Sequence, residues 1–457
     1  MSITALHRSC LPAIACTLLF GLGPPSACRS EPVLLVSEPD SEQSQAILDR
    51  LQIGLDQGQL AQLKQLDLSG APLLNSELGL LLNMPGLESL TLDHIVLQHG
   101  DLAWILRHLP NLKHLSLQDC ALDERVFDEF PPGLQLAELN LAFNQIRSLP
   151  ADFNALVPQL GQLDLSANPI PDFTNLSGAL YLKRLKADQL RGSELQLPDR
   201  LPALRELDLI ESVPTAAPLQ VLANYPHLEH LALGQLRWNA EIEHLIAHKL
   251  RLKSLQLEEI ETESPFLLAA LLRRPLLQRL ELLHLAPDAL PSAAANAPCF
   301  LQRLALQEME LSKPAIQWVQ SCSQLKSLDM SGSQINASLL DGAAFQLQQL
   351  VLAETRLPRA GLSGLHRQTG LRDLDIRSLT IMPDVFATIL KLNKLQRLAV
   401  DYQPWSDQKM QQLLQALPEL RFLSAIGSPV SARQWRLVQA RFPHLRIQTE
   451  QPGGPDI

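Results

Sequence analysis

The chain has 457 residues, of which 46% are hydrophobic but only 4% aromatic, and its formal net charge is -10 at pH 7. This acidic balance argues against a nucleic-acid binder, because neutralising phosphates requires a basic surface. The scarcity of aromatic rings indicates an interior built from aliphatic side chains.

Residues 1–28 resemble a secretory signal peptide. Arg8 is the only early charge, and the apolar run Cys10–Gly23 is shorter than the roughly 20 residues that span a bilayer. Ser26-Ala27-Cys28 resembles the end of a bacterial lipobox, which makes Cys28 a candidate for lipidation. Pro25 departs from that motif, which has an aliphatic residue at this place. The alternative to export is a disordered N-terminal stretch of a cytoplasmic or injected protein.

The next segments are expected to lead into the body of the protein. Residues 29–44 are acidic, contain proline and lack an apolar period, which predicts a flexible tether. Residues 45–62 carry apolar side chains at helical spacing and are expected to cap the first coil. Residues 63–450 hold the repeats described next, and residues 451–457 are expected to form a disordered tail.

A leucine pattern, L-x-x-L-x-L, recurs every 22 to 25 residues through this region. Within each copy the alternation directs leucines inward and the residues between them outward, as in a strand. A period of this length predicts stacked coils, each of which buries its apolar face only against its neighbours. The copies begin at Leu63, Leu87, Leu112, Leu136, Leu160, Leu182, Leu204, Leu228, Leu252, Leu277, Leu301, Leu325, Leu347, Leu371, Leu395 and Leu420, with a truncated copy at Leu445.

Most copies return to the next strand through apolar residues at helical spacing, such as Leu102, Ile105 and Leu106. Proline often stands two residues before the first leucine of a strand, as at Pro110 and Pro418. Proline ends a helix and favours extended backbone before it, so we expect short helices that stop at these points.

Two copies, residues 136–146 and 160–170, reproduce the pattern L-x-x-L-x-L-x-x-N-x-L in full. The chain therefore resembles the leucine-rich repeat superfamily over about 390 residues. The resemblance implies an α/β fold, a curved horseshoe solenoid with a concave parallel β-sheet and short convex helices. It also implies recognition of macromolecules, usually proteins, on the concave face. Other copies replace the asparagine, for example with Cys120, Ser212, Ile260, Leu285 or Met309, so their turns must satisfy the backbone differently.

Three cysteines, Cys120, Cys299 and Cys322, fall at inward positions or repeat boundaries. Packing as small apolar side chains is the default expectation for such thiols. Cys299 and Cys322 stand just before strands of neighbouring copies, so a disulfide between them is the alternative in an oxidising compartment. No cysteine or histidine spacing predicts a zinc site.

The outward strand positions carry two stripes of opposite charge. The two positions after the first leucine are mostly basic, and the positions around and after the last leucine are mostly acidic. Such stripes could orient a partner, or their charges could simply pair between neighbouring coils. The acidic stripe contains one local cluster that we expect to receive a basic partner, with a divalent cation as the alternative: Glu258, Glu259, Glu281, His284 and Glu308.

Exposed aromatic residues provide a second candidate surface. Tyr402 and Phe422 are expected to lie together with Ile426, and Trp405 is close to them in sequence. Aromatic anchors are frequent in protein interfaces. Packing against a C-terminal capping helix explains the same residues equally well.

No nucleotide-binding, zinc-protease or serine-hydrolase motif occurs, so no catalytic, cofactor or metal residue is predicted. We expect a monomeric, non-enzymatic protein that binds a protein partner on its concave face and does not bind nucleic acid. Its expected location is outside the cytoplasm, lipid-anchored to the cell envelope through Cys28 or secreted. A secreted effector that binds a host protein, and a recognition subunit of an enzyme complex, are the alternatives.

Overall fold

The computed structural model describes residues 2–4, 57–71, 75–190, 195–212, 217–262, 275–285, 290, 299–379 and 383–449. Most of the expected signal peptide, the tether, most of the N-terminal cap and the tail lie outside these residues, including Cys28. The short strand β1 (Ser2–Thr4) is described and pairs in parallel with β2 (Gln65–Asp67). No helix in the described ranges is both long and apolar enough to span a bilayer. The chain divides into two compact units, unit 1 (Met1–Leu204) and unit 2 (Arg205–Ile457).

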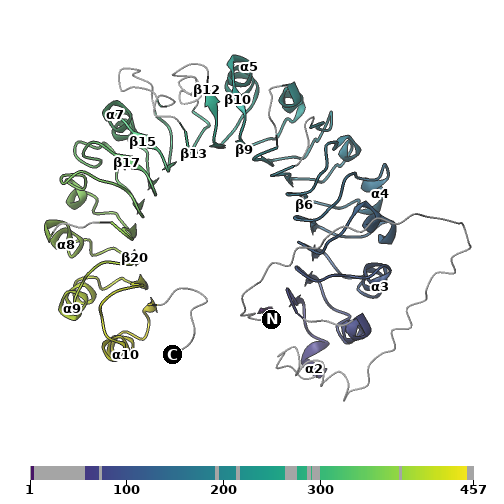
Figure 1. Ribbon diagram of the computed structural model, residues 1–457, viewed down its shortest axis with the longest axis horizontal. Helices are drawn as coiled ribbons and strands as arrows, with labels where there is room; N and C mark the ends of the chain where they lie inside the picture. Colours follow the sequence, from purple (N-terminus) through teal and green to yellow (C-terminus); the bar gives the residue numbers. More distant parts are fainter. Residues whose placement is uncertain are drawn as a thin grey trace, which may run out of the picture. The chain divides into compact units, whose positions relative to one another are not determined.

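Unit 1 is a stack of coils whose strands form a parallel sheet with leucine opposite leucine, as in the register of Leu115 with Leu139. Its strands line one side of the stack and its helices line the other (Figure 1). The strands after β2 are β3 (Ser89–Thr91), β4 (His114–Ser116), β5 (Glu138–Asn140), β6 (Gln162–Asp164) and β7 (Arg184–Lys186). The helices are α2 (Gln57–Leu60), η1 (Asn75–Asn83), α3 (Asp101–His108), η2 (Glu124–Glu129), α4 (Phe153–Leu156) and η3 (Thr174–Leu176).

Unit 2 repeats this arrangement. Its main parallel sheet contains β8 (Glu206–Leu209), β9 (His230–Gly234), β11 (Ser254–Glu258), β13 (Arg279–Leu283), β14 (Arg303–Gln307), β16 (Ser327–Asp329), β18 (Gln349–Val351), β19 (Asp373–Asp375), β20 (Arg397–Ala399), β21 (Phe422–Ser424) and β22 (Arg446–Gln448). Two small parallel pairs lie beside it, β10 (Arg237–Trp238) with β12 (Glu261–Thr262) and β15 (Glu310–Leu311) with β17 (Gln334–Ile335). The helices are η4 (Ala217–Asn224), α5 (Ala240–His244), η5 (Leu245–Lys249), α7 (Lys313–Ser321), η8 (Leu365–Arg367), α8 (Pro383–Ile389), α9 (Asp407–Ala416) and α10 (Ala432–Arg441).

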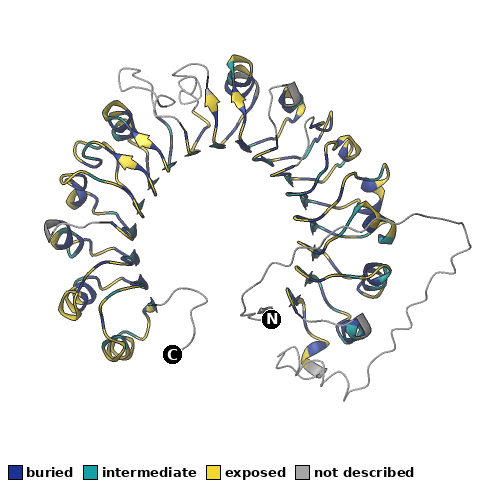
Figure 2. Ribbon diagram, in the orientation of Figure 1, coloured by how far each residue is buried: buried dark blue, intermediate teal, exposed yellow. Residues whose placement is uncertain are grey.

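The core of both units is the column of inward leucines. Leu136, Leu139 and Leu141 are at most 2% exposed, and the same three positions are buried in coil after coil. Burying one such side chain contributes about 1.5 to 3 kcal/mol. The helices complete the core with one face, so α3 and α9 each show a buried side and an exposed side (Figure 2). The predicted α/β fold, a leucine-rich repeat solenoid, is confirmed.

Local sequence explains where the longer helices begin and end. Ser312, Ser406 and Ser431 precede α7, α9 and α10, and each serine hydroxyl accepts a hydrogen bond from a backbone N–H of the first helical turn. Proline follows two residues after the end of the helix at Pro418 and Pro443, as predicted.

In every full coil the eighth residue of the repeat has a positive φ angle, between 48° and 70°. We call these residues the turn row. Most turn-row N–H groups donate to a carbonyl of the next coil, as from Phe143 to Ser166 at 2.8 Å and from Glu354 to Arg377 at 3.0 Å. The row comprises Gly70, His94, Asp119, Phe143, Ala167, Gln189, Glu211, Gln235, Glu259, His284, Glu308, Gly332, Glu354, Ser378, Tyr402 and Gly427. The turn therefore continues the backbone hydrogen bonds of the strands into the next coil. It requires a left-handed backbone conformation, which is unfavourable for residues other than glycine.

Of the three cysteines in the repeats, two form a disulfide and one packs in the core. Cys299 and Cys322 form a disulfide between neighbouring coils, with their Cα atoms 4.9 Å apart. Cys120 is a free, buried thiol, and burial raises its pKa to about 11. The default expectation of core packing is therefore right for Cys120 and wrong for the other two.

Candidate functional site

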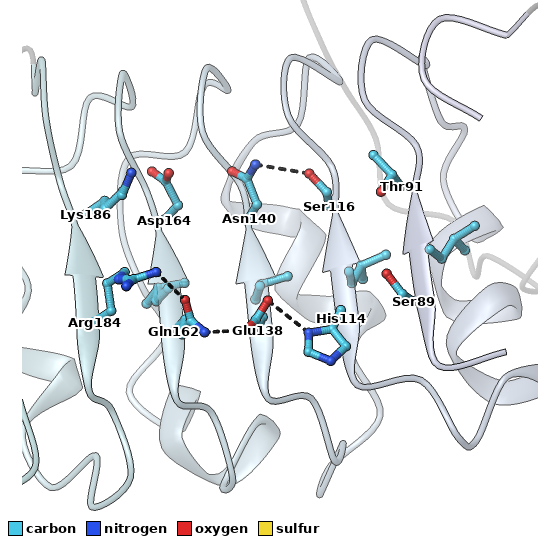
Figure 3. Close-up of a pocket in the computed structure, with 14 residues that line it drawn as sticks. Ser89, Thr91, His114, Ser116, Glu138, Asn140, Gln162, Asp164, Arg184 and Lys186 are labelled. Carbon is cyan, nitrogen blue, oxygen red and sulfur yellow. Dashed lines mark hydrogen bonds and ion pairs between the residues drawn. The ribbon is translucent and has the colours of Figure 1, made fainter. Parts of the chain in front are cut away.

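A polar groove lies on the strand face of unit 1, across β3 to β7, with a volume of about 290 Å³ (Figure 3). The alternation of the strands places outward side chains there from the third and fifth positions of five successive repeats. These side chains are Ser89, Thr91, His114, Ser116, Glu138, Asn140, Gln162, Asp164, Arg184 and Lys186.

Four of the third-position side chains, from His114 to Arg184, form one continuous row of contacts (Figure 3). His114 Nδ1 lies 2.9 Å from Glu138 Oε2, and Gln162 Nε2 donates to Glu138 Oε1. Arg184 Nη1 donates in turn to Gln162 Oε1 at 2.9 Å. Each member is held by its neighbour, so this wall of the groove is fixed before any partner arrives.

The fifth-position side chains form the other wall. Asn140 Nδ2 donates to Ser116 Oγ at 3.0 Å, and Ser116 donates to Asp93 at 2.6 Å. Thr91 and Lys186, at the two ends of this wall, make no side-chain hydrogen bond or ion pair with any described residue. The groove has its smallest side chains toward β3 and ends in a free ammonium group at β7.

One exposed aromatic ring accompanies the groove. Phe143 follows β5 in the turn row and is 51% exposed. Because it belongs to the same coil as Glu138 and Asn140, it stands at the edge of the strand face that holds the groove. A large apolar ring beside a polar recess is a common composition for a protein-binding surface.

Four of the five residues of the acidic cluster predicted in unit 2 lie close together: Glu258, Glu259, His284 and Glu308. Burial raises the pKa of Glu258, while nearby His284 lowers it and Glu259 and Glu308 raise it further. His284 Nε2 lies 2.6 Å from Glu308 Oε2, and Glu259 accepts a hydrogen bond from Gln235. Glu259, His284 and Glu308 belong to the turn row, and Glu258 ends strand β11.

Glu281 has a different setting from the other four. Its carboxylate pairs with Arg279 Nε at 2.7 Å, on the same strand. Both residues line a second, smaller cavity of about 190 Å³ over β13 to β18, together with Arg303 and Asp329. Within the described part of the chain, no group of three or more histidine, cysteine, aspartate or glutamate side chains is arranged to hold a metal ion.

Within the basic stripe, occasional glutamates form ion pairs with basic side chains of the neighbouring coils. Glu88 accepts from Lys64 at 3.0 Å and Lys113 at 2.7 Å, and these two ammonium groups lower its pKa to about 2. Glu229 is placed in the same way between Arg205 and Lys253. The interpretation that charges pair across neighbouring coils accounts for these residues.

The predicted aromatic surface is smaller than the sequence suggested. Tyr402 is 54% exposed, and its ring lies against Gly427 of the next coil. Phe422 is half-buried under the guanidinium of Arg397, which lies 5.2 Å from the ring centroid. Trp405 is buried against Phe386 and belongs to the core instead.

Sequence reasoning missed the groove of unit 1. Its signal was present as small polar residues at outward positions of two neighbouring strands, Ser89, Thr91 and Ser116. Charge alone does not identify these positions, because they are recessed only through the shortness of their side chains.

The comparisons with known proteins bear on the fold alone. No protein family matches this chain by its sequence model, and no curated protein matches it in sequence. Among solved structures it is similar to TLR13 in the TLR13–ssRNA13 complex, with 19% identity and a TM-score of 0.47 over 88% of this chain. The chain spans 65% of TLR13, less than two thirds of its length.

Two bacterial structures are also similar. An internalin, InlF, from Listeria monocytogenes has 16% identity and a TM-score of 0.34, covering 89% of this chain and 93% of the internalin. A leucine-rich repeat protein from Leptospira interrogans has 18% identity and a TM-score of 0.42, covering 86% and 97%. The repeat pattern, the parallel strand pairing and the buried leucine columns described above give this chain the fold of a leucine-rich repeat solenoid.

Proposed function

We propose that the protein is a non-enzymatic binding protein that holds a protein partner against the strand face of unit 1. The groove over β3 to β7 is the observation that carries this proposal. Its walls present donors and acceptors already fixed by hydrogen bonds, so few side chains lose freedom when a partner docks.

The chemistry of the groove favours a polar polypeptide surface. It offers Glu138 and Asp164 as acceptors and Lys186 as a free donor, with the ring of Phe143 at the edge. Mixed polar contacts around an aromatic anchor are typical of protein interfaces. A volume of about 290 Å³ on a strand face suits side chains of a larger partner.

Site-specific crosslinking tests this proposal. A photoreactive p-benzoylphenylalanine placed at Thr91 should capture one predominant protein from the native host, identified by mass spectrometry. The same group at Lys391, an exposed position after α8, is the control. Equal capture from both positions would reject the groove as the binding site.

Two substitutions then test the contact without removing a described hydrogen bond. Thr91→Trp fills the groove and Lys186→Glu reverses its free charge, and the double variant should weaken an identified partner by about a hundredfold, or roughly 3 kcal/mol. Lys391→Glu makes the same charge change elsewhere and should leave binding unaltered. Unchanged affinity of the double variant would contradict the proposal.

The acidic cluster of unit 2 is a second candidate contact. Reversing Glu258 and Glu259 together should weaken a basic partner and slow its association, because charge at the edge of an interface acts mainly on encounter. If the affinity for an identified partner does not change, the cluster is only a solvated surface.

We further propose that the protein is exported and that Cys28 tethers it to the envelope, with secretion as the alternative. The signal-like sequence of residues 1–28 supports export, and so does the disulfide between Cys299 and Cys322, because disulfides persist in oxidising compartments. Intact mass and membrane fractionation, beside a Cys28→Ser variant, test the tether. An unprocessed, soluble chain beginning at Met1 would favour an effector delivered to a host protein. Recognition within an enzyme complex would require a catalytic partner chain.

A further inference from the structure

The last coil of unit 2 differs in charge from the rest of this acidic chain. Residues 420–449 contain five arginines and no aspartate or glutamate, although the whole chain has a net charge of -10. The arginines are Arg421, Arg433, Arg436, Arg441 and Arg446. Three of them lie on α10, and one lies on β22.

The outer side of α10 gathers arginines around an apolar residue. Arg433, Arg436, Leu437 and Ala440 follow the i, i+3, i+4, i+7 spacing of one helix face, and all four are exposed. Leu437 is 57% exposed. The opposite side of the helix contains Val438, which is buried in the coil. We call Arg433, Arg436, Leu437 and Arg441 the C-terminal basic face.

The two exposed arginines Arg433 and Arg436 have no ion pair with any described residue. Some other arginines of unit 2 do have one, such as Arg279 with Glu281 and Arg377 with Asp375. Arg441 lies 5.6 Å from the ring of Phe442, which is not a charge partner. Like charges three residues apart destabilise a helix. The face is therefore electrostatically unsatisfied in the isolated chain.

We propose that the C-terminal basic face docks an acidic polypeptide segment of a partner protein, with an apolar side chain of that segment covering Leu437. Charge complementarity supports this occupant, because guanidinium groups bind carboxylates with two parallel hydrogen bonds. A lipid surface fits less well. A helix that lies in a membrane interface inserts a broad apolar face, and α10 exposes a single large apolar residue. This surface is separate from the groove of unit 1 and does not depend on it.

The test uses the full chain and a fluorescently labelled peptide of glutamates interrupted by leucines. We expect saturable binding that weakens steeply with salt and falls by about tenfold or more in Arg433→Glu/Arg436→Glu. Leu437→Ser should weaken binding with little change in its salt dependence. A peptide with glutamine in place of every glutamate should not bind.

Matched variants distinguish binding at the C-terminal basic face from a general effect of the protein's net charge. Arg107→Glu/Arg251→Glu makes the same charge change at exposed arginines elsewhere and should leave peptide binding unchanged. Circular dichroism of each variant establishes that it is folded, and Arg433→Gln/Arg436→Gln provides a milder pair. Peptide binding that is equal in all variants overturns the proposal. Binding to phosphatidylglycerol vesicles that is lost in Arg433→Glu/Arg436→Glu, without peptide binding, would also overturn it and assign the face to an anionic membrane.

Discussion

Two kinds of coil pair the backbone groups of the same turn in different ways. In unit 1 they are coils with asparagine at the ninth position, and in unit 2 they are coils with five-residue strands. In unit 1, Asn144 and Asn168 occupy the ninth position of their repeats, directly after the turn row. In unit 2, the four strands of five residues all belong to coils whose ninth residue is apolar, Leu236, Ile260, Leu285 or Met309. The turn needs its backbone groups paired in both places, because buried unpaired amides are costly.

Asn168 shows the side-chain solution. It is fully buried, its Nδ2 donates to the carbonyls of Leu141 at 2.8 Å and Leu165 at 3.1 Å, and its Oδ1 accepts from Ile146 N at 3.0 Å. The side-chain amide of Asn168 thus joins two neighbouring coils and also closes the turn of its own coil.

Met309 shows a mixed solution, in which a serine of the next coil and the backbone together take the place of the asparagine. Its N–H donates to Ser333 Oγ of the next coil, and its carbonyl accepts from Gln334 N at 2.9 Å, where β15 and β17 begin a second short ladder. Leu236 accepts from Glu261 N in the same way. In these four coils, the apolar ninth residue therefore goes together with a longer strand and further backbone hydrogen bonds to the next coil.

Asn168→Leu should break the side-chain solution and have the largest effect. It leaves two carbonyls and one N–H without this partner, and about 1 to 3 kcal/mol for each unsatisfied buried group gives roughly 3 to 9 kcal/mol of lost stability. Met309→Leu places the same side chain at the ninth position of unit 2 and should cost less than about 1.5 kcal/mol. Urea unfolding of both variants measures the contrast, and equal losses would contradict the two-solution interpretation.

Reducing the disulfide should weaken unit 2 selectively. Cys299 and Cys322 enclose a loop with a sequence separation of 23, for which loss of the crosslink is expected to cost about 3 kcal/mol. Hydrogen exchange with and without reductant should show faster opening around β14 and α7 and no change in unit 1. The double variant Cys299→Ser/Cys322→Ser should not respond to reductant. Equal loss of protection in both units would show that they unfold together.

Two glycines of the turn row give a smaller and matched contrast. Gly70 has φ 63° and open space around it, whereas a Cβ at Gly427, φ 66°, would lie 2.6 Å from the ring of Tyr402. Left-handed backbone should cost Gly70→Ala about 1 to 2 kcal/mol. Gly427→Ala must in addition displace Tyr402, so it should lose more stability. Adding Tyr402→Ala should remove that excess, and a double variant as unstable as Gly427→Ala alone would rule out the ring as its cause.

The fold could be predicted because the inward leucines repeat at a fixed period and each one has the same physical task. The helix ends were predictable for the same reason, since Pro418 and Pro443 act locally. The turn row was not foreseen, because its side chains range from Ala167 to Tyr402 and share only a backbone angle. The type of the eighth residue does not predict its backbone conformation, because a backbone hydrogen bond to the next coil fixes that conformation.

The candidate site was predicted only in part, because the charge of a residue does not show how deeply its side chain lies or which side chain it pairs with. Glu258, Glu259, His284 and Glu308 lie close together, but Glu281 pairs with Arg279 two residues earlier, a contact that depends on rotamers. Trp405 was close to Tyr402 in sequence, yet the return segment directs it into the core. The groove of unit 1 depends on side-chain size in five coils at once, which no single repeat shows.

The smallest predicted effects are opposite pH responses of one glutamate from each unit. Lys113 and Lys64 lower the pKa of Glu88 from 4.5 to about 2, so its stabilising contribution is present above pH 4.5 and is lost as the pH falls toward 2. Burial raises the pKa of Glu258, so its contribution favours the folded state at low pH and is lost as the pH rises through the raised value. At pH 7, Glu88→Gln should therefore lower stability and Glu258→Gln should raise it. Both differences should shrink in urea unfolding repeated at progressively lower pH, and a shift of the same sign for both variants at pH 7 would show that burial and ion pairing do not separate the two sites.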